Sequence, residues 1–592
     1  MFGKKFVSFR GKRLEDDMKN WYENVEFGFM MHFGLYSLLG GEYKDRKCDV
    51  ICEWIQNRLE IPNTEYEKLA TQFNPVNFNA EDIVKRAKKC GMKYIVFTSK
   101  HHEGFALFHS EVDKFNLYDA SPCKRDLVAE LADACHKYDM KLGLYYSQDL
   151  DWHEPDGGGY PETILNCNLM NWDNRWDYPD VEKKDYSRCF ERKIKPQLKE
   201  LLTKYGEISL IWFDTPKTIS PEQSAELRAM VKQYQPNCVI NARIGNGYED
   251  YITFGDNEFS LIKSDKPWEM VATMSDTWGF RKGDKRWRTP KEIEKILGRI
   301  VSRGGHYLLN VGPDETGALP EESIEIMDTI AAWMERNHEA VIGAKSNPYP
   351  FEYGFGAVTA GDKCVYLHLH QVPENDVIAL SDVSETVSGV SVLGSGQELK
   401  FFKEKDRLVI SLPNLEELSL SEKGIWADDT VPVIKVSFAE SLGEHTRREI
   451  PLHGAMSLSP CDGAASGNIK FCVSGAIDDG WLDTSGAITY ELYAPQAGRY
   501  HLSMISGLLD WKGEYRKGNR LLVAVNGKGY EFMLNDDRPL DSYLRAYYVG
   551  FGSELGSIAL HEGLNRLTLI VTEFAEGNQV GMPLMNLIIG ME

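Results

Sequence analysis

Short apolar runs alternate with amphipathic segments over the first 340 residues of the chain. Apolar runs that predict strands lie at 27–33, 93–99, 141–147, 208–214, 238–244 and 306–312. The segments between them repeat apolar residues every three to four positions and predict helices at 80–91, 125–138, 189–205, 221–234, 289–304 and 320–337. Continuous apolar strands that alternate with helices are typical of a parallel sheet covered on both faces.

The number of these units favours a closed barrel over an open, doubly wound sheet. About seven strand–helix units follow one another here, which approaches the eight of a (β/α)₈ barrel. No glycine-rich dinucleotide loop follows the first strand, which also argues against a Rossmann fold. One strand near 268–275 is only weakly marked. We therefore expect residues 1–345 to form an irregular (β/α)₈-type, TIM-like barrel.

The pattern changes after about residue 345. Short segments of alternating polarity, such as "KCVYLHLH" and "RLVISLP", are separated by Gly, Pro and Asp. This alternation predicts antiparallel β-sandwiches. We expect one sandwich at 346–435 and a second at 436–592, which serves either as a sugar-binding module or as a packing domain. The predicted fold class is thus α/β plus all-β.

Composition and charge exclude several kinds of partner. The net charge of −22 leaves no basic field for nucleic acid or for an anionic membrane surface. No run of eighteen apolar residues predicts a membrane-spanning helix. The N-terminus lacks the apolar stretch of a signal peptide, and the eleven scattered cysteines fit free thiols, so we expect a cytoplasmic protein. A periplasmic or secreted protein trimmed of its leader would have the same sequence, and homo-oligomerisation stays open.

Polar and aromatic side chains gather at the ends of the predicted strands. In a parallel barrel these ends converge on one face, where the working groups lie. The strand ends and the loops that follow them carry His32, Lys100, His101, His102, Tyr145, Tyr146, Trp152, His153, Trp212, Asp214 and Arg243. A lone histidine at a strand end is usually structural, but five such ends together indicate a site. Donors and flat aromatic faces suit a polyhydroxylated ring.

These residues also allow two other interpretations. Asp214 ends the apolar run of "SLIWFDT", where it is either a cap on the next turn or a catalytic group. His32, His101, His102 and Asp214 offer a set of cation ligands. Adjacent histidines on a strand point to opposite faces, so a metal site requires that the strand has already ended. We predict no metal and no cofactor.

Cleavage of a glycosidic bond would need a second carboxyl group opposite Asp214. Downstream candidates are Asp250, Asp256, Glu258 and Glu269. Glu269 lies between aromatic residues in "DKPWEMVATMSDTWGF", a setting that would desolvate the carboxyl and raise its pKa. Glu258, in "FGDNEF", has a more polar setting. Either glutamate is equally compatible with a solvated loop residue.

Several segments together resemble the family-29 glycoside hydrolases, the α-L-fucosidases. They include "EFGFMMHFGLYS", "GMKYIVFTSKHHEGFALFHS", "LIWFD", "PWEMVATMSDTWGF" and "SRGGHYLLNVGP", and they follow in order from about 20 to 343. The resemblance implies a retaining exo-glycosidase that releases terminal α-L-fucose from an oligosaccharide or glycoconjugate. It also implies an irregular barrel followed by a β-sandwich. The variations "KHHEGF", "WGF" and "GGHYLLN" concern fine specificity.

The same resemblance assigns roles to individual residues. Asp214 matches the nucleophile, and Glu269 is favoured as the acid/base, with Glu258 as the alternative. The residues that match the sugar pocket are His32, Glu53, Trp54, His101, His102, Tyr145, Trp212 and Arg243. Three rival functions remain: the same chemistry on a related sugar such as α-L-galactose, a non-catalytic carbohydrate-binding protein, and a metal-dependent hydrolase.

Overall fold

The protein forms two compact units. The computed structural model describes residues 21–22, 24–48, 51–160, 172–258, 264, 266–373, 375–414, 424–426, 429–471, 480–509, 518–535, 538–540, 548–577 and 582–592. The first unit comprises Met1–Gly255, Lys266–Arg288 and His306–Met334, and the second comprises Asp256–Asp265, Thr289–Gly305 and Glu335–Glu592. None of the helices in the described ranges is long and apolar enough to cross a membrane.

The first unit is built on an eight-stranded sheet in which all neighbouring strands are parallel. In sheet order the strands are β7 (Val239–Ile240), β6 (Leu210–Phe213), β5 (Lys141–Tyr146), β4 (Tyr94–Lys100), β1 (Phe27–Met31), β10 (His306–Val311), β9 (Trp268–Thr273) and β8 (Ile252–Thr253). A parallel bridge between Asn241 and Tyr251 links the two edge strands. The prediction of a TIM-like barrel is therefore confirmed.

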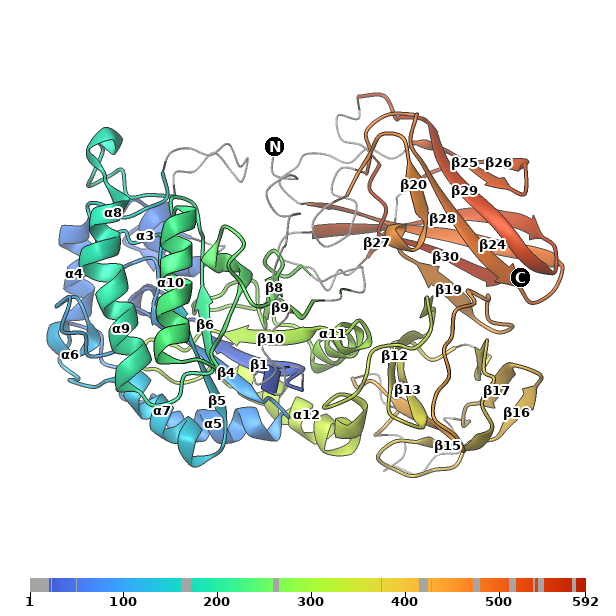
Figure 1. Cartoon of the computed structure of the whole chain (residues 1–592), viewed down its shortest axis with the longest axis horizontal. Coiled ribbons are helices and arrows are strands. Elements are labelled where there is room, and N and C mark those ends of the chain that lie inside the picture. Colours follow the sequence, from blue (N-terminus) through green and yellow to red (C-terminus); the bar gives the residue numbers. More distant parts are fainter. Residues whose placement is uncertain are drawn as a thin grey trace. The chain divides into compact units, whose positions relative to one another are not determined.

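Helices alternate with these strands, and Figure 1 shows α9 and α10 side by side over them. The helices of this region are α2 (Tyr36–Leu39), α3 (Ile55–Arg58), α4 (Asn63–Ala70), α5 (Ala80–Lys89), α6 (Leu117–Ala120), α7 (Leu127–Lys137), α8 (Tyr186–Cys189), α9 (Lys195–Lys204), α10 (Pro221–Tyr234) and α12 (Glu321–Asn337). Side-chain caps fix their starts: Asp126 accepts from the Ala129 N–H before α7, and Ser220 forms a capping box with Gln223 before α10.

Two strand ends differ from the sequence-based boundaries in ways that matter for the site. Strand β4 ends at Lys100, so His101 and His102 lie beyond it and are not bound to opposite faces of the sheet. Strand β7 is only two residues long and leads into the 3₁₀ turn η4 (Ala242–Ile244), which carries Arg243. The weakly marked strand is present as β9, and all its residues are buried.

Large side chains fill the interior of the barrel. One buried apolar cluster includes Tyr94 of β4, Trp212 of β6 and Leu308 of β10. Gly28 makes room for this packing, because a Cβ at that position would lie 2.3 Å from the Tyr94 ring. The barrel is a packed core rather than a pore, which leaves the strand ends as the place for a site.

The second unit contains three larger antiparallel sheets. The ten-stranded sheet has the order β15 (Val387–Val392), β18 (Val433–Phe438), β13 (Cys364–Leu369), β12 (Gly356–Ala360), β11 (Glu352–Tyr353), β19 (Ala455–Leu458), β30 (Asn586–Met591), β24 (Gly498–Leu509), β28 (Tyr548–Leu560) and β27 (Arg538–Leu540). The others are β14 (Val377–Leu380), β17 (Arg407–Ser411) and β16 (Phe401–Glu404), and β20 (Ala464–Ser466), β23 (Ala487–Ala494), β29 (Gly563–Glu573), β25 (Arg520–Val525) and β26 (Lys528–Met533). The all-β half of the predicted fold class is thereby confirmed.

Helix α11 (Pro290–Ser302) packs within this second unit. Its Glu294 accepts a hydrogen bond of 2.8 Å from the backbone N–H of Val431, and Gly298 lies against the His368 ring. Tyr353 of β11 pairs with Met456 of β19, so strands that come before residue 435 in the sequence and strands that come after it belong to one sheet. The domain boundaries after 345 and 435 remain predictions.

Candidate active site

Asp214 lies directly after β6, at the carboxyl end of the barrel strands. Its Oδ1 atom accepts hydrogen bonds from Arg243 Nη1 at 2.9 Å and from the Thr215 N–H at 2.8 Å. Its Oδ2 atom accepts one from the Tyr145 hydroxyl at 2.8 Å. Thr215 has a φ of +50°, a strained value for a β-branched residue, so the chain turns sharply just beyond the carboxylate.

The charges around Asp214 keep it ionised. Burial alone would raise the pKa of this carboxyl, but the charge of Arg243 and the hydrogen bonds from Arg243 and Tyr145 act against it, and the pKa lies below its ordinary value. His102 Nε2 is 3.5 Å from Asp214 Oδ2, yet burial lowers the pKa of His102 to about 3. Because His102 is therefore neutral near pH 7, Arg243 is the cation that holds the charge on Asp214.

Two pocket histidines have their tautomers fixed by hydrogen bonds. The amide nitrogen of Asn310 donates to the Trp278 carbonyl, so its Oδ1 atom accepts from His32 Nδ1 at 2.7 Å. Ser147 Oγ donates to the Leu150 carbonyl and accepts from His102 Nδ1 at 2.6 Å. Assigned from these partners, both rings donate through Nδ1, and the neutral ring of His102 leaves its Nε2 atom as an acceptor.

The ring of His101 lies between the other two histidines. Its centroid is 4.2 Å from that of His102 and 5.5 Å from that of His32. His101 is only 2% exposed, and its Nδ1 atom has no hydrogen-bond partner among the described residues. Buried polar atoms are almost always satisfied, so this nitrogen is available to water or to a polar group of a ligand.

Tryptophans form an apolar wall beside the histidines. The ring of Trp54 lies 5.1 Å from His102, 5.2 Å from Trp152 and 5.3 Å from Trp172, measured between centroids. Trp54 and Trp172 are partly exposed, whereas Trp152 is fully buried. Such a wall offers aromatic faces to the apolar side of a sugar ring.

Glu53 supports this wall from behind. It lies in the 3₁₀ turn η1 (Cys52–Trp54), and its Oε2 atom accepts from the Gly279 N–H at 3.0 Å and from Thr277 Oγ1 at 3.2 Å. The carboxylate therefore ties Trp54 to the loop that carries Trp278, whose ring is 5.3 Å from His32. Figure 1 shows where β9 and β10, which flank this loop in the sequence, lie in the barrel.

Glu269 lies inside the barrel. It is the second residue of β9, pairs in register with His306 at the start of β10, and is 0% exposed. Oε1 accepts from Trp212 Nε1 at 2.9 Å, and Oε2 accepts from the Tyr94 hydroxyl at 2.8 Å. The hydroxyl of Tyr251 is 3.4 Å away. Burial raises the pKa of Glu269 to about 7, although these hydrogen bonds act in the opposite direction.

Trp212 connects the two carboxylates. Its indole N–H donates to Glu269, its ring stacks on Tyr145 at 5.5 Å, and the guanidinium of Arg243 lies 4.8 Å from its centroid. Tyr145 and Arg243 are the two side chains that donate to Asp214. The structure thus brings together Asp214, Arg243, Tyr145, Trp212, the three histidines, Trp54 and Glu53, and places Glu269 beneath them.

Glu258 belongs to the short segment after β8 and is partly buried. Arg243 Nη2 donates to the carbonyl of Phe254, four residues earlier, at 3.3 Å. Arg243 therefore ties the start of this loop to Asp214. Whether Glu258 or Glu269 is the acid/base stays a prediction.

Gln148 is a site residue that the sequence-based selection missed. Its Oε1 atom accepts from the Asp214 N–H at 2.8 Å, and its Nε2 atom donates to the Arg243 carbonyl at 2.9 Å. It follows β5 by two residues and lies between Tyr146 and Trp152, so its place near a strand end is a signal in the sequence, although its amide side chain does not by itself indicate a contact with Asp214. Among the described residues, no group of three His, Cys, Asp or Glu side chains has the geometry of a metal site.

Comparisons with known proteins agree on one family. The family sequence model described as Alpha-L-fucosidase matches residues 9–339. Human tissue alpha-L-fucosidase is 27% identical over 432 residues, which are 69% of this chain and 87% of that protein. The crystal structure of alpha-L-fucosidase from Vibrio sp. strain EJY3 has a TM-score of 0.82 at 26% identity and covers 98% of each chain. Alpha-L-fucosidase AlfC from Lactobacillus casei, in complex with alpha-L-fucose product, is 45% identical, with a TM-score of 0.51, over 54% of this chain and 99% of that one.

Proposed function

Because the chain belongs to the alpha-L-fucosidase family, we propose that Asp214 is the nucleophile with which it releases terminal α-L-fucose. The chain is a glycoside hydrolase, and α-L-fucose is its sugar. The observation that carries the assignment of Asp214 is its ionised carboxylate at the end of β6, held by Arg243 and Tyr145 beside neutral histidines. A nucleophilic carboxylate has to be unprotonated to attack.

The proposed reaction is a double displacement. Asp214 Oδ attacks the anomeric carbon while the bond from that carbon to the leaving oxygen breaks, and the leaving oxygen takes a proton from a carboxylic acid. Water then attacks the anomeric carbon of the glycosyl–enzyme, the bond from that carbon to Asp214 Oδ breaks, and the water gives a proton to the acid/base carboxylate that donated one in the first step. Two displacements at one carbon restore its configuration, so the released sugar keeps the α configuration.

The pocket histidines fit recognition of sugar hydroxyl groups. His102 presents an unprotonated Nε2 atom, which accepts hydrogen bonds from hydroxyl protons, and His32 is held by Asn310 beside it. His101 supplies a buried nitrogen that a ligand would satisfy. Trp54 and Trp278 supply apolar faces for the carbon side of the ring, which in fucose includes a methyl group.

For the acid/base, we favour the loop after β8 over Glu269. A general acid has to reach the leaving oxygen directly or through one water molecule. Glu269 is fully enclosed, and both its oxygens accept hydrogen bonds from barrel aromatics. The loop that Arg243 holds at Phe254 carries Glu258, the residue assigned this role as the alternative, and also Asp256. Exchange of each of the three carboxyls separates them.

The natural substrate is proposed to be a fucosylated oligosaccharide or glycoconjugate. Stereochemistry and sugar preference test this together. Hydrolysis of an aryl α-L-fucoside followed by NMR should first give α-L-fucose, and a panel of nitrophenyl glycosides should rank α-L-fucoside first. First formation of the β anomer would refute the double displacement, and faster turnover of the α-L-galactoside would reassign the sugar.

A reducing, cytoplasmic location is proposed as well. None of the nine cysteines in the described residues forms a disulfide bond, and most are buried. Cysteines outside disulfides are typical of compartments where glutathione keeps thiols reduced. Fractionation of the source cells, with activity on an aryl α-L-fucoside as the readout, tests the location. Size-exclusion chromatography with light scattering tests the homo-oligomer that the sequence leaves open.

A further inference from the structure

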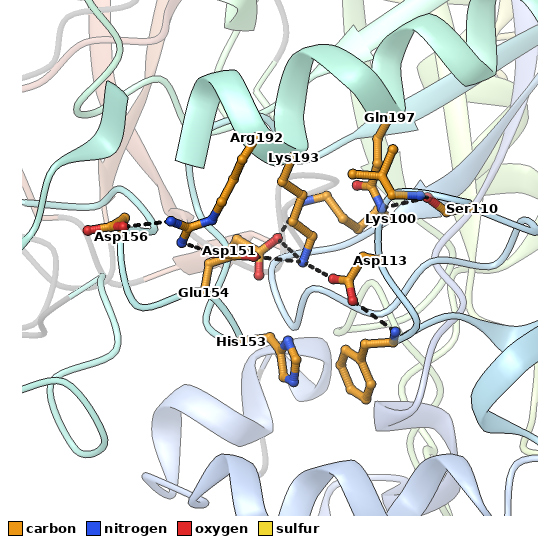
Figure 2. Close-up of polar contacts among 12 residues, drawn as sticks. Lys100, Ser110, Asp113, Asp151, His153, Glu154, Asp156, Arg192, Lys193 and Gln197 are labelled. Carbon is orange, nitrogen blue, oxygen red and sulfur yellow. Dashed lines mark hydrogen bonds and ion pairs between the residues drawn. The ribbon is translucent and has the colours of Figure 1, made fainter. Parts of the chain in front are cut away.

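A buried cluster of charged side chains lies next to the histidine pocket and has no part in the proposed reaction. Asp151 Oδ2 is 3.0 Å from the Nζ atom of Lys100 and 3.0 Å from that of Lys193 (Figure 2). All three residues are at most 2% exposed. Lys193 Nζ is also 2.6 Å from Asp113 Oδ2 and 3.8 Å from Glu154 Oε1.

Lys193 comes from an unusual turn. The π-helical segment η3 (Phe190–Ile194) precedes α9. Such segments are rare in proteins, and those that occur often lie at functional sites. Arg192, the neighbour of Lys193, pairs with Glu154 and lies 3.0 Å from Asp156 Oδ2. Figure 2 shows both cations of this turn directed at the loop 151–156. The turn therefore clamps the loop that follows β5.

Asp151 and Lys193 are held in their charged forms although they are buried, whereas burial lowers the pKa of Lys100. Burial alone would raise the pKa of Asp151, but Lys100 and Lys193 lower it below its ordinary value. Burial alone would lower the pKa of Lys193, but Asp151 and Asp113 raise it. Buried ion pairs add little net stability over apolar packing, whereas their geometry constrains the groups they join. The role of this cluster therefore depends on the residues that it holds in place.

Two short paths lead from the cluster to His102. Lys100 Nζ donates to the carbonyl of Ser147 at 2.8 Å, and Ser147 Oγ accepts from His102 Nδ1 at 2.6 Å. The residue after Asp151 is Trp152, whose backbone N–H donates to the His102 carbonyl at 2.7 Å. Both the ring and the backbone of His102 are thus held by residues that the cluster fixes.

We propose that the Lys193–Asp151–Lys100 cluster is a positioning device that sets His102 and Trp152 against the sugar pocket. The proposal rests on the proposed function in that the pocket is taken to bind α-L-fucose. The π-helical turn fixes Asp151, Asp151 and Lys100 fix Trp152 and Ser147, and these fix the Nε2 atom of His102 beside Asp214. Lys193 itself touches no substrate and acts only through these residues.

Exchange of Lys193→Met removes the charge and keeps the length of the side chain. Lys195→Met is the matched control, because Lys195 lies two residues further on and pairs with Glu191 at 2.9 Å and Glu226 at 2.5 Å, outside the clamped loop. Active sites are first counted by trapping the glycosyl–enzyme with a 2-fluoro-fucosyl fluoride. We expect K193M to raise KM and the inhibition constant of free L-fucose about 10-fold, and K195M to leave both within about 2-fold.

Hydrogen exchange reads the proposal without any turnover. The Trp152 amide should lose protection in K193M and keep it in K195M, and Asp113→Asn should give the same change in weaker form if K193M folds poorly. An absence of α-L-fucoside hydrolysis by the unmodified protein would refute the proposed function and leave this exchange test valid. The positioning role would be overturned by unchanged Trp152 protection in both K193M and D113N. It would also be overturned if KM and the inhibition constant of L-fucose in K193M equalled those of the unmodified protein.

Discussion

Asp214 and Glu269 are two buried carboxyl groups of one barrel, and their pKa values are shifted in opposite directions. Both accept hydrogen bonds from aromatic side chains: Tyr145 donates to Asp214, and Trp212 donates to Glu269. The rings of Tyr145 and Trp212 stack on each other. The pKa of Asp214 lies below its ordinary value, whereas that of Glu269 is raised to about 7. The difference is a direct contact with a cation: Arg243 hydrogen-bonds to Asp214, whereas Glu269 accepts hydrogen bonds from neutral hydroxyl and indole groups. Burial alone does not make a carboxyl an acid or a nucleophile; its partner decides.

Removal of the nucleophile should have the largest effect. Asp214→Gly should lower turnover of an aryl α-L-fucoside by about 10⁴-fold or more, because the covalent step is lost. Azide should partly restore the release of nitrophenol and give a fucosyl azide of inverted configuration, which NMR identifies. Wild-type turnover by the glycine variant would remove Asp214 from the mechanism.

Glu258→Gln should follow, with a loss of about 10²–10³-fold that grows as the leaving group becomes more basic, since protonation of that oxygen is what fails. Asp256→Asn and Glu269→Gln are measured beside it with dinitrophenyl and methyl α-L-fucosides. The variant whose loss depends on the leaving group identifies the acid/base. If only E269Q shows that dependence, the enclosed carboxyl is the acid after all and the contrast with Asp214 has a catalytic meaning.

How far the sequence predicts this comparison differs between the two residues. Asp214 ends a clear apolar run, so the strand-end rule places it in the site without any coordinates. Glu269 was expected to be desolvated by its aromatic neighbours, which agrees with its raised pKa. Its strand β9 is only weakly marked in the sequence, because a charged second residue interrupts the apolar run. The direction of a side chain depends on strand register, and register depends on partners such as His306 that lie far away in the sequence.

The supporting contacts were the least predictable part. Gln148 and Ser147 act through hydrogen bonds to the backbone of Asp214 and to the ring of His102. Lys193 reaches the loop after β5 from a π-helical turn that no periodicity in the segment indicates. Such contacts arise when loops from different strands meet, whereas sequence patterns report only the local period.

Loss of the cation should bring the two carboxylates closer in proton affinity. Arg243→Gln should raise the pKa of Asp214 and move the acidic limb of kcat/KM upward by about 1–3 pH units. At pH 5 the variant should therefore retain a smaller fraction of its own maximal activity than wild type does. An acidic limb that stays in place would mean that hydrogen bonds, not charge, keep Asp214 ionised. Lys195→Met serves as a control for removal of a cation elsewhere.

Stability provides the smallest and most specific test of Glu269. Its pKa in the folded chain, about 7, lies above the 4.5 of an unperturbed glutamate, so the folded state holds the proton more tightly. The stability that comes from this protonated form is fully present below about pH 4.5 and is lost as pH rises towards 7, by up to about 3 kcal/mol. Glu269→Gln keeps an acceptor for the Trp212 N–H but cannot ionise. Its unfolding midpoint relative to wild type should therefore rise between pH 5 and pH 8, as differential scanning calorimetry would measure. An equal difference at both pH values would mean that Glu269 is already ionised at pH 5, and its resemblance to Asp214 would be closer than the hydrogen bonds indicate.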